Sequence, residues 1–233
     1  MTASLLIDYR SLWVAETNCY VVAPESGGPA VVIDAPPDPE GIGAILAKHD
    51  LTPVALLVTH GHIDHAGGAG GVVRATGVPA YVHPDDDFLS LHPADQLRLL
   101  FGVALDDDQA APFAPPDHYE PLADGQRLDV AGLTVEVLHT PGHTPGHCCF
   151  LLRDEGVLFS GDQLFAGSIG RTDLPGGDYD TLMQSMASRV LPLPEATEVL
   201  PGHGPATTLA PPPCILRARI VVVRTETWGF RPL

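Results

Sequence analysis

The sequence predicts an α/β protein built from many short strands and helices. Its 233 residues include 24 glycines and 24 prolines, which imply frequent turns rather than long helices. Short β-branched and apolar runs alternate with turn clusters and with segments of helical spacing. A hydrophobic content of 45% is enough for a sizeable core, and a mean hydropathy of +0.13 excludes a disordered chain.

The first third of the chain justifies this assignment element by element. Two apolar runs flank a Gly-Gly-Pro turn and predict a hairpin. A segment with apolar residues at helical spacing behind a proline predicts a helix, and a β-branched run predicts a strand buried on both faces. A glycine-weakened helix and a short strand follow. In chain order these elements cover residues 17–22, 30–34, 39–50 (helix), 54–59, the segment that ends at Gly77 (helix) and 80–83.

Residues 84–120 interrupt this rhythm. They hold several prolines and two acidic runs, Asp85-Asp86-Asp87 and Asp106-Asp107-Asp108, and we interpret them as a surface insertion with solvated acidic runs. Strands and an amphipathic helix then resume, so residues 1–210 are predicted to form one domain. The later elements are a short helix at 94–101, strands at 127–130, 133–139, 148–152, 157–160 and 198–200, and a helix at 179–190.

The charge balance excludes several classes of partner. Twelve basic and 29 acidic residues give a net charge of −17, which repels phosphate backbones and anionic lipid surfaces. No run approaches the roughly 20 apolar residues of a membrane span. The four cysteines, two of them adjacent, do not form a disulfide framework. We therefore expect a cytoplasmic protein without nucleic-acid or membrane partners.

A dense group of metal-ligand side chains follows the predicted strand at 54–59. Residues 60–65 read His-Gly-His-Ile-Asp-His, which places three imidazoles and a carboxylate within six positions. Imidazole nitrogens and carboxylate oxygens are ligands of zinc, iron and manganese. A histidine-rich surface turn is the alternative interpretation, but the segment follows a buried strand. The pattern therefore favours a metal site.

Three further segments repeat one arrangement, in which an apolar strand is followed by a glycine and a ligand-type residue. The ligand-type residues are His143, Asp162 and His203. Strand ends are where α/β folds place their sites, so the repetition predicts that these residues join the first group. Five histidines and two aspartates suffice for two metal ions, with Asp162 suited to bridge them.

At these residues the chain resembles the metallo-β-lactamase superfamily. The shared segments are Thr-His-Gly-His-Ile-Asp-His-Ala-Gly-Gly, Thr-Pro-Gly-His-Thr-Pro-Gly-His, Ser-Gly-Asp and Pro-Gly-His-Gly-Pro, in the family's order between about residues 10 and 208. The resemblance implies a four-layer αβ/βα sandwich with the metal site along one edge of its two sheets. It also implies a first metal held by His60, His62 and His143, a second held by Asp64, His65 and His203, and Asp162 between them.

A narrower resemblance concerns the nine residues at 165–173, Phe-Ala-Gly-Ser-Ile-Gly-Arg-Thr-Asp. They look like the hydroxyacylglutathione hydrolase (glyoxalase II) branch and its short bacterial relatives. In those thioesterases the loop lies beside the thiol part of the substrate, which implies that Arg171 contacts the substrate. The alternative is that Arg171 pairs with Asp173 or Asp178 and only fixes the loop.

These features predict a metal-dependent hydrolase of thioesters of the hydroxyacylglutathione hydrolase type. As a hypothesis, two cations about 3.5–4 Å apart hold a bridging hydroxide that attacks the thioester carbonyl. Asp64 is the catalytic candidate, because it would ligate a metal and orient the nucleophile. The expected cofactors are two divalent ions, zinc first, with iron or manganese as alternatives. The expected partner is a small-molecule thioester, and the sequence leaves open whether the protein is a homodimer.

Three alternatives stay open. The first is a persulfide dioxygenase with a single iron, since those members of the superfamily share the Gly-Arg-Thr-Asp stretch. The second is a lactonase or β-lactamase, and the third is a metal-binding module without activity. Residues 211–233 form an atypical C-terminal tail that matches no ending of the family, and full-length glyoxalase II enzymes carry a helical region there that contacts glutathione.

Overall fold

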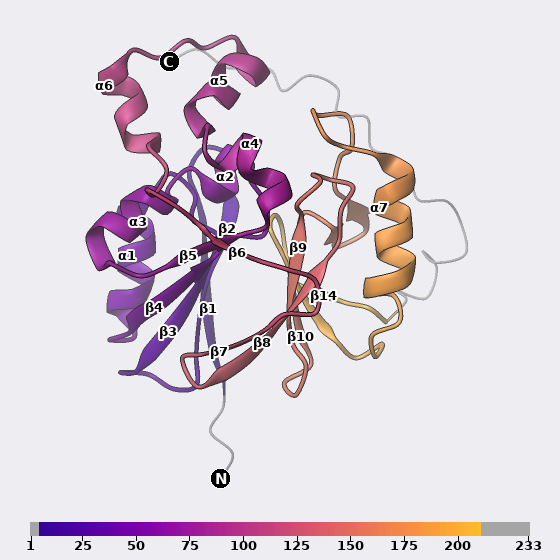
Figure 1. The fold of residues 1–233 in the computed structure, drawn as a ribbon. Helices are drawn as coiled ribbons and strands as arrows, with labels where there is room; N and C mark the ends of the chain where they lie inside the picture. The colour runs from indigo at the N-terminus through magenta and orange to yellow at the C-terminus, as the bar shows by residue number, and fades with distance from the viewer. Residues whose placement is uncertain (1–4, 211–233) are drawn as a thin grey trace.

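Two six-stranded sheets face each other in the computed structural model, which describes residues 5–210 (Figure 1). The first sheet has the order β1 (Leu6–Leu12), β2 (Thr17–Ala23), β3 (Pro29–Ile33), β4 (Thr52–Leu57), β5 (Ala80–Val82), β6 (Glu120–Pro121). The second has the order β14 (Thr207–Thr208), β13 (Glu198–Pro201), β10 (Val157–Gly161), β9 (Cys148–Leu152), β8 (Leu133–His139), β7 (Arg127–Val130). A small ribbon pairs β11 (Leu164–Phe165) with β12 (Ser168–Ile169).

The helices lie outside the two sheets or at their edge. Helix α1 begins where Asp38 accepts a hydrogen bond from the Gly41 N–H, and α3 ends at Gly77, which adopts a left-handed φ of 73°. The helices in chain order are α1 (Pro39–Lys48), α2 (Ile63–Ala66), α3 (Ala69–Thr76), η1 (Pro84–Asp86), α4 (Asp87–Ser90), α5 (Pro93–Phe101), α6 (Asp107–Ala110), η2 (Ala111–Phe113), α7 (Tyr179–Ser185) and the π-helical turn η3 (Met186–Val190).

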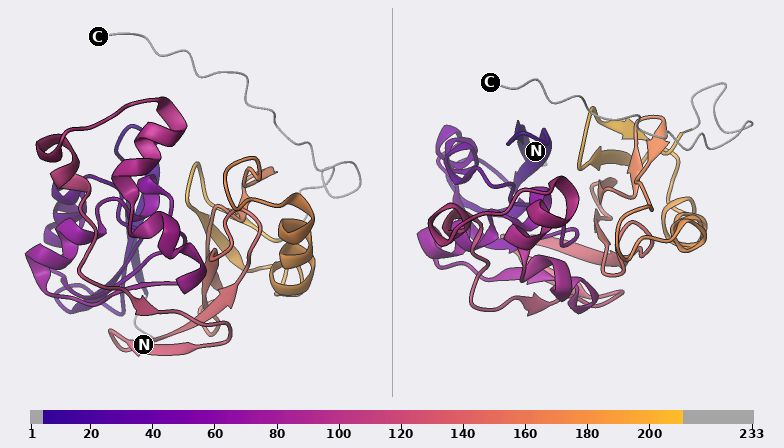
Figure 2. Two further views of the ribbon diagram at one scale, coloured as in Figure 1. Left: turned by 45° about the horizontal axis from the view of Figure 1, so that its top comes forward. Right: turned by 90° about the horizontal axis from the view of Figure 1, so that it is seen from above.

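Three separate apolar clusters define four layers. One joins α1 and α3 to the first sheet, a second fills the space between the sheets, and a third joins the second sheet to α7 and η3. Strand β2 is buried along its whole length because alternate residues serve two clusters: Val21 faces the helices and Val22 faces the second sheet. The N-terminal and C-terminal halves accordingly lie side by side in Figure 2. The predicted αβ/βα sandwich is confirmed.

Strand direction brings the carboxyl ends of five strands to one edge of the sandwich. Strands β8 and β10 are both antiparallel to β9, and β13 is parallel to β10, so β8, β10 and β13 all run the same way. In the first sheet β3 and β4 are parallel. The segments that leave these strands therefore approach one another at a common edge, as is usual for α/β sites.

The predicted elements are present with small shifts at their ends, and the structure adds several short ones. Strand β1 had not been predicted, because it is a half-exposed edge strand with charged residues rather than an apolar run. The predicted helix at 179–190 turns π-helical after Ser185. The predicted strand at 54–59 ends at Leu57. The tail at 211–233 lies outside the described residues. Within residues 5–210, no helix combines the length and the apolar character that crossing a bilayer requires.

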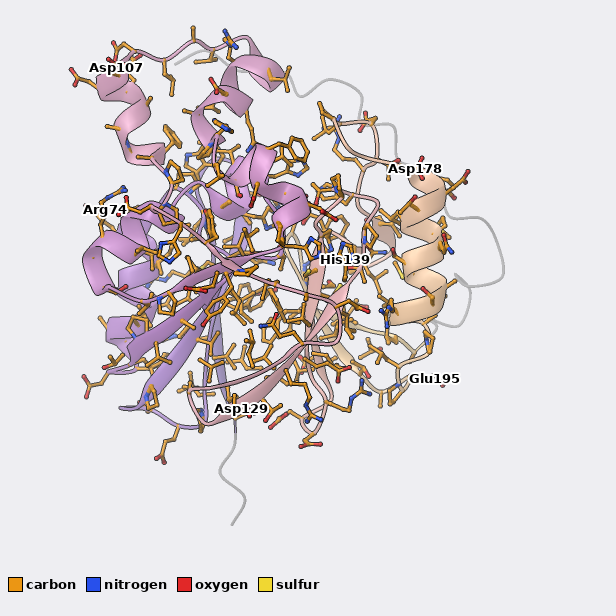
Figure 3. All side chains as sticks on the ribbon, in the orientation of Figure 1. Arg74, Asp107, Asp129, His139, Asp178 and Glu195 are labelled. Atoms are coloured by element: carbon orange, nitrogen blue, oxygen red, sulfur yellow. The ribbon has the colours of Figure 1, made fainter. Side chains whose placement is uncertain are left out.

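The two acidic runs of the insertion at 84–120 differ in their exposure. The run Asp106–Asp108 is exposed as expected, and Figure 3 shows Asp107 at the outer tip of α6. Asp86, in contrast, is 0% exposed. The prediction of a solvated run at 85–87 is wrong at Asp86, because the side chain turns inward to accept three hydrogen bonds.

The cluster between the sheets should dominate the stability of the fold. Phe150 is fully buried there, so Phe150→Ala is expected to lower the free energy of unfolding by about 3–5 kcal/mol, measured by urea denaturation. Val14 is 85% exposed, and Val14→Ala should change it by less than about 0.5 kcal/mol. Equal effects of the two substitutions would contradict this assignment of the core.

Candidate metal centre

All seven predicted ligand residues meet at the common strand edge. The segment after β4 and the start of α2 supply His60, His62, Asp64 and His65; the loop between β8 and β9 supplies His143; and the ends of β10 and β13 supply Asp162 and His203. Their ligand atoms form overlapping groups in which every atom lies within 4.8 Å of the others. The structure therefore brings together the side chains that the sequence pattern singled out.

Three imidazoles form the first group. The His60 Nε2 lies 3.1 Å from the His62 Nδ1, which lies 3.0 Å from the His143 Nε2, and the two Nε2 atoms lie 3.2 Å apart. All three side chains are buried. Three ring nitrogens thus form a nearly equilateral triangle at the edge of the sheets.

Hydrogen bonds on the far side of two rings fix which nitrogen carries a lone pair. The His143 Nδ1 donates to the Arg171 carbonyl at 2.7 Å, because a carbonyl can only accept. The Thr59 hydroxyl donates its single proton to Asp34, so it accepts from the His60 Nδ1 at 3.0 Å. Both Nε2 atoms are therefore unprotonated when these rings are neutral, and their lone pairs point into the triangle.

This arrangement fits a cation. A tetrahedral centre with metal–nitrogen bonds of about 2.0–2.1 Å places its ligand atoms about 3.3–3.4 Å apart, close to the observed spacings. Lone pairs that face one another at such distances repel unless a cation or proton lies between them. The donor set and the spacing therefore both suit a divalent metal ion.

The second group adds two carboxylates. The Asp64 Oδ2 lies 3.4 Å from the His65 Nε2 and 3.2 Å from the His203 Nε2, and these two nitrogens lie 3.4 Å apart. The Asp162 Oδ2 lies 3.5 Å from the His143 Nε2 and 3.6 Å from the His203 Nε2, so it reaches both groups. The Asp162 Oδ1 is buried without a hydrogen-bond partner among the described residues, as expected of a carboxylate that serves a metal.

The two groups differ in electrostatic character. Burial, followed by the charge of neighbouring imidazoles, lowers the pKa of His62 to about 3 and that of His60 well below its usual value. Burial also opposes the charged form of His65, but the carboxylates of Asp64 and Asp162 outweigh it and raise the His65 pKa well above its usual value. The first group thus offers neutral nitrogen ligands, and the second lies in a negative field that attracts a cation.

Several supporting residues were not predicted from the sequence. Asp34 is buried directly after β3 and accepts from the Thr59 N–H at 2.7 Å and from the His65 Nδ1 at 2.8 Å. The Thr17 hydroxyl donates to the Asp64 Oδ2 at 2.9 Å. Asp34 is an acidic residue directly after an apolar strand, without the glycine that precedes His143, Asp162 and His203, and its place at the strand end is the signal that could have identified it.

A further histidine, His147, lies beside the first group, with its ring 5.2 Å from that of His60. It is fully buried, and its Nε2 accepts from the Asp162 N–H at 3.0 Å. Because that nitrogen accepts, its Nδ1 carries the proton and donates to the Thr140 hydroxyl at 2.9 Å. His147 therefore orients the backbone at Asp162 rather than offering a lone pair to a metal.

Arg171 lies beside the centre but its side chain is engaged elsewhere. Its Nε and Nη2 donate to the two carboxylate oxygens of Asp173 at 2.7 and 3.0 Å, and the side chain is 52% exposed. The pair predicted as the alternative interpretation is thus formed with Asp173. The backbone carbonyl of Arg171 accepts from His143, so the loop supports the first group directly.

A separate group of His83, Asp85 and His139 has poorer geometry for a metal. The two rings are stacked 4.0 Å apart at 6°, so their in-plane lone pairs run parallel rather than converging. The His139 Nε2 donates to the Pro145 carbonyl at 2.8 Å. Figure 3 shows His139 between the two sheets. His83 follows β5 of the first sheet and His139 ends β8 of the second, so the stacked rings pack the ends of these two strands together.

Comparisons with known proteins agree with this geometry. The chain is 34% identical over 194 residues to the hydroxyacylglutathione hydrolase GloC of Haemophilus influenzae, covering 83% of this chain and 88% of that protein. It matches the crystal structure of TTHA1623 in a di-iron-bound form with a TM-score of 0.75 and 40% identity, over 87% of this chain and 94% of that one. It matches the crystal structure of the B3 metallo-β-lactamase BLEG-1 with a TM-score of 0.77 and 37% identity, over 88% and 94% of the two chains. Residues 12–203 match the family description of the metallo-β-lactamase superfamily, and the chain belongs to that superfamily.

Proposed function

We propose that this metallo-hydrolase cleaves thioesters of the hydroxyacylglutathione type. The observation that carries the proposal is the pair of adjoining ligand groups that share Asp162. Support comes from the relative in Haemophilus influenzae, which is described as a hydroxyacylglutathione hydrolase. We also propose a cytoplasmic location, since the cysteines within residues 5–210 are free and buried.

The proposed ligand sets follow the two groups of the centre. His60, His62 and His143 would hold one divalent ion, Asp64, His65 and His203 the other, and Asp162 would serve both. When bound, such ions polarise a carbonyl oxygen and lower the pKa of a water from 15.7 to about 7. Zinc is our first choice, and iron or manganese are alternatives because the ligands are imidazoles and carboxylates.

Asp64 is proposed to orient the water nucleophile. Burial alone would raise its pKa, but the His65 and His203 rings beside it lower that pKa well below its usual value. The carboxylate is therefore ionised at neutral pH and can accept a hydrogen bond from the attacking water. The Thr17 hydroxyl holds its Oδ2 in place.

The leaving group needs little help from the protein. An ordinary thiol has a pKa near 8.5, so a thiolate departs without a strong general acid. The proposed reaction therefore requires no additional proton donor from the site.

Removal of single ligands should abolish turnover. His60→Ala and Asp162→Ala are each expected to lower kcat for S-lactoylglutathione by at least about 10³-fold, because loss of one electrostatic stabiliser alone costs about 10²–10³-fold. Circular dichroism should show both variants folded. His92 has a 61% exposed side chain outside the centre, and His92→Ala should leave kcat unchanged. Retained thioesterase activity in either ligand variant would contradict the assignment.

The same purified protein separates the alternatives. Two zinc-like ions per chain with thioester hydrolysis support the proposal. One iron with oxygen uptake on a persulfide identifies a dioxygenase, and preferential cleavage of a lactone or β-lactam identifies the other hydrolases. Two bound ions without turnover on any of these substrates would identify a metal-binding module.

Metal removal should destabilise the fold at its sheet edge. At a free ion concentration about 1,000 times its Kd, one bound ion stabilises the folded state by about 4 kcal/mol. Because about 1 kcal/mol shifts Tm by roughly 2–4 °C in a domain of this size, chelation is expected to lower Tm by about 8–16 °C. Re-addition of zinc should restore it. An unchanged Tm after complete removal, verified by elemental analysis, would count against resident ions.

Arg171 is proposed to bind a substrate carboxylate by leaving Asp173. Arg171→Gln should then raise KM for S-lactoylglutathione about tenfold with kcat unchanged, since a charged hydrogen bond contributes about 1.5–3 kcal/mol. Arg153 is a matched control because it is also exposed and pairs through two contacts with Glu136. If Arg171→Gln and Arg153→Gln have the same KM as the unmodified protein, Arg171 only fixes the loop.

A further inference from the structure

A buried carboxylate from the insertion lies between two ligand loops. Asp86, at the end of η1, is 0% exposed, whereas Asp85 and Asp87 on either side are exposed. A carboxylate this deeply buried requires donors around it, since an unpaired charge in the interior is costly. Its partners therefore reveal its role.

Asp86 accepts from three donors that belong to the two loops of the first ligand group. Its Oδ2 accepts from the Gly61 N–H at 2.8 Å, and Gly61 separates His60 from His62. The same oxygen accepts from the Thr144 hydroxyl at 2.7 Å, and its Oδ1 accepts from the Gly146 N–H at 2.6 Å. Thr144 directly follows His143. One side chain thus connects all three imidazole-bearing positions of this group.

A side chain at either of two neighbouring glycines would lie too close to Asp86. A Cβ at Gly61 would lie 2.9 Å from the Asp86 carbonyl oxygen, and a Cβ at Gly146 would lie 2.7 Å from the Asp86 Cγ. Both positions are glycine where the insertion approaches the loops. The insertion therefore comes closest to the two loops at Asp86, the residue that also accepts the three hydrogen bonds.

A second polar side chain of the insertion strengthens this connection. Gln96, in α5, is 4% exposed; its Oε1 accepts from the Ile63 N–H at 3.0 Å and its Nε2 donates to the Gly61 carbonyl at 2.9 Å. The second ligand group depends on other partners, because Asp34 accepts from His65 and Thr17 donates to Asp64. Gln96 thus also reaches the start of α2, which carries Asp64 and His65, whereas the Asp86 side chain bonds to the loops of the first group alone.

We propose that Asp86 is a positioning residue that holds the His60–His62 segment and the His143 loop at the spacing of the first metal site. This inference rests on the proposed metal centre but not on the substrate. The carboxylate is suited to the task because all three partners are donors. An amide in its place would turn its NH2 group toward at least one backbone N–H in either orientation.

Metal binding tests the inference without any substrate. We expect Asp86→Asn to weaken zinc binding at one of the two sites by about 10- to 100-fold, measured by competition with a chromophoric chelator, and to leave the other site unchanged. Cobalt(II)-substituted protein should lose the absorption of one of its two ions. Asp87→Asn is the matched control, since this neighbouring aspartate is exposed, and it should bind both ions as the unmodified protein does.

If Asp86→Asn does not fold, a milder variant tests the same inference. Thr144→Val removes one of the three donors and keeps the size of the side chain, so it should weaken the same site by a smaller factor. Unchanged binding of both ions in the folded variants, or equal weakening of both, would overturn the inference. Two bound ions without thioester hydrolysis in the unmodified protein would refute the proposed function and leave this inference standing.

Discussion

The convergence of parallel strand ends at one edge is the constraint on which the site depends. β8, β10 and β13 run the same way, and each delivers a ligand-type residue within a few positions of its end. The first sheet contributes the segment after β4 from the opposite side. No candidate ligand lies on a long loop. The folded sandwich therefore sets the distances between the candidate ligand atoms.

That spacing is unfavourable for the protein alone. Neutral imidazole nitrogens face one another at 3.0–3.2 Å, and two ionised carboxylates lie beside them in a buried setting. Partners outside the centre hold the rings against this repulsion: Thr59 and the Arg171 carbonyl act on the first group, and Asp34 acts on the second. A cation would relieve the repulsion that the fold otherwise has to withstand, which links metal affinity to stability.

The sequence singled out the residues that the structure brings together, but not their hydrogen-bond partners, for a physical reason. The candidate ligand residues recur in a local pattern, in which a glycine and a histidine or aspartate follow an apolar strand. This pattern can be recognised in the sequence alone. Asp86 has no such pattern, because it lies in an acidic run whose other members are exposed, and only the tertiary structure shows that it turns inward. The π-helical end of the helix after Ser185 likewise leaves no mark in the helical spacing from which the helix was predicted.

The two candidate ligand groups are unequal in their access to solvent. The first group is almost fully buried, with the insertion on one side and the Arg171 loop on the other. The His203 side chain is 30% exposed and that of Asp64 19% exposed, and the Phe165 ring lies 6.1 Å from the His203 ring. The candidate centre is therefore open to solvent on the side of the second group, near the segment that contains Phe165. Asp86 of the insertion contacts the buried group, so a change at Asp86 would act on the first site and leave the exposed side of the second unaltered.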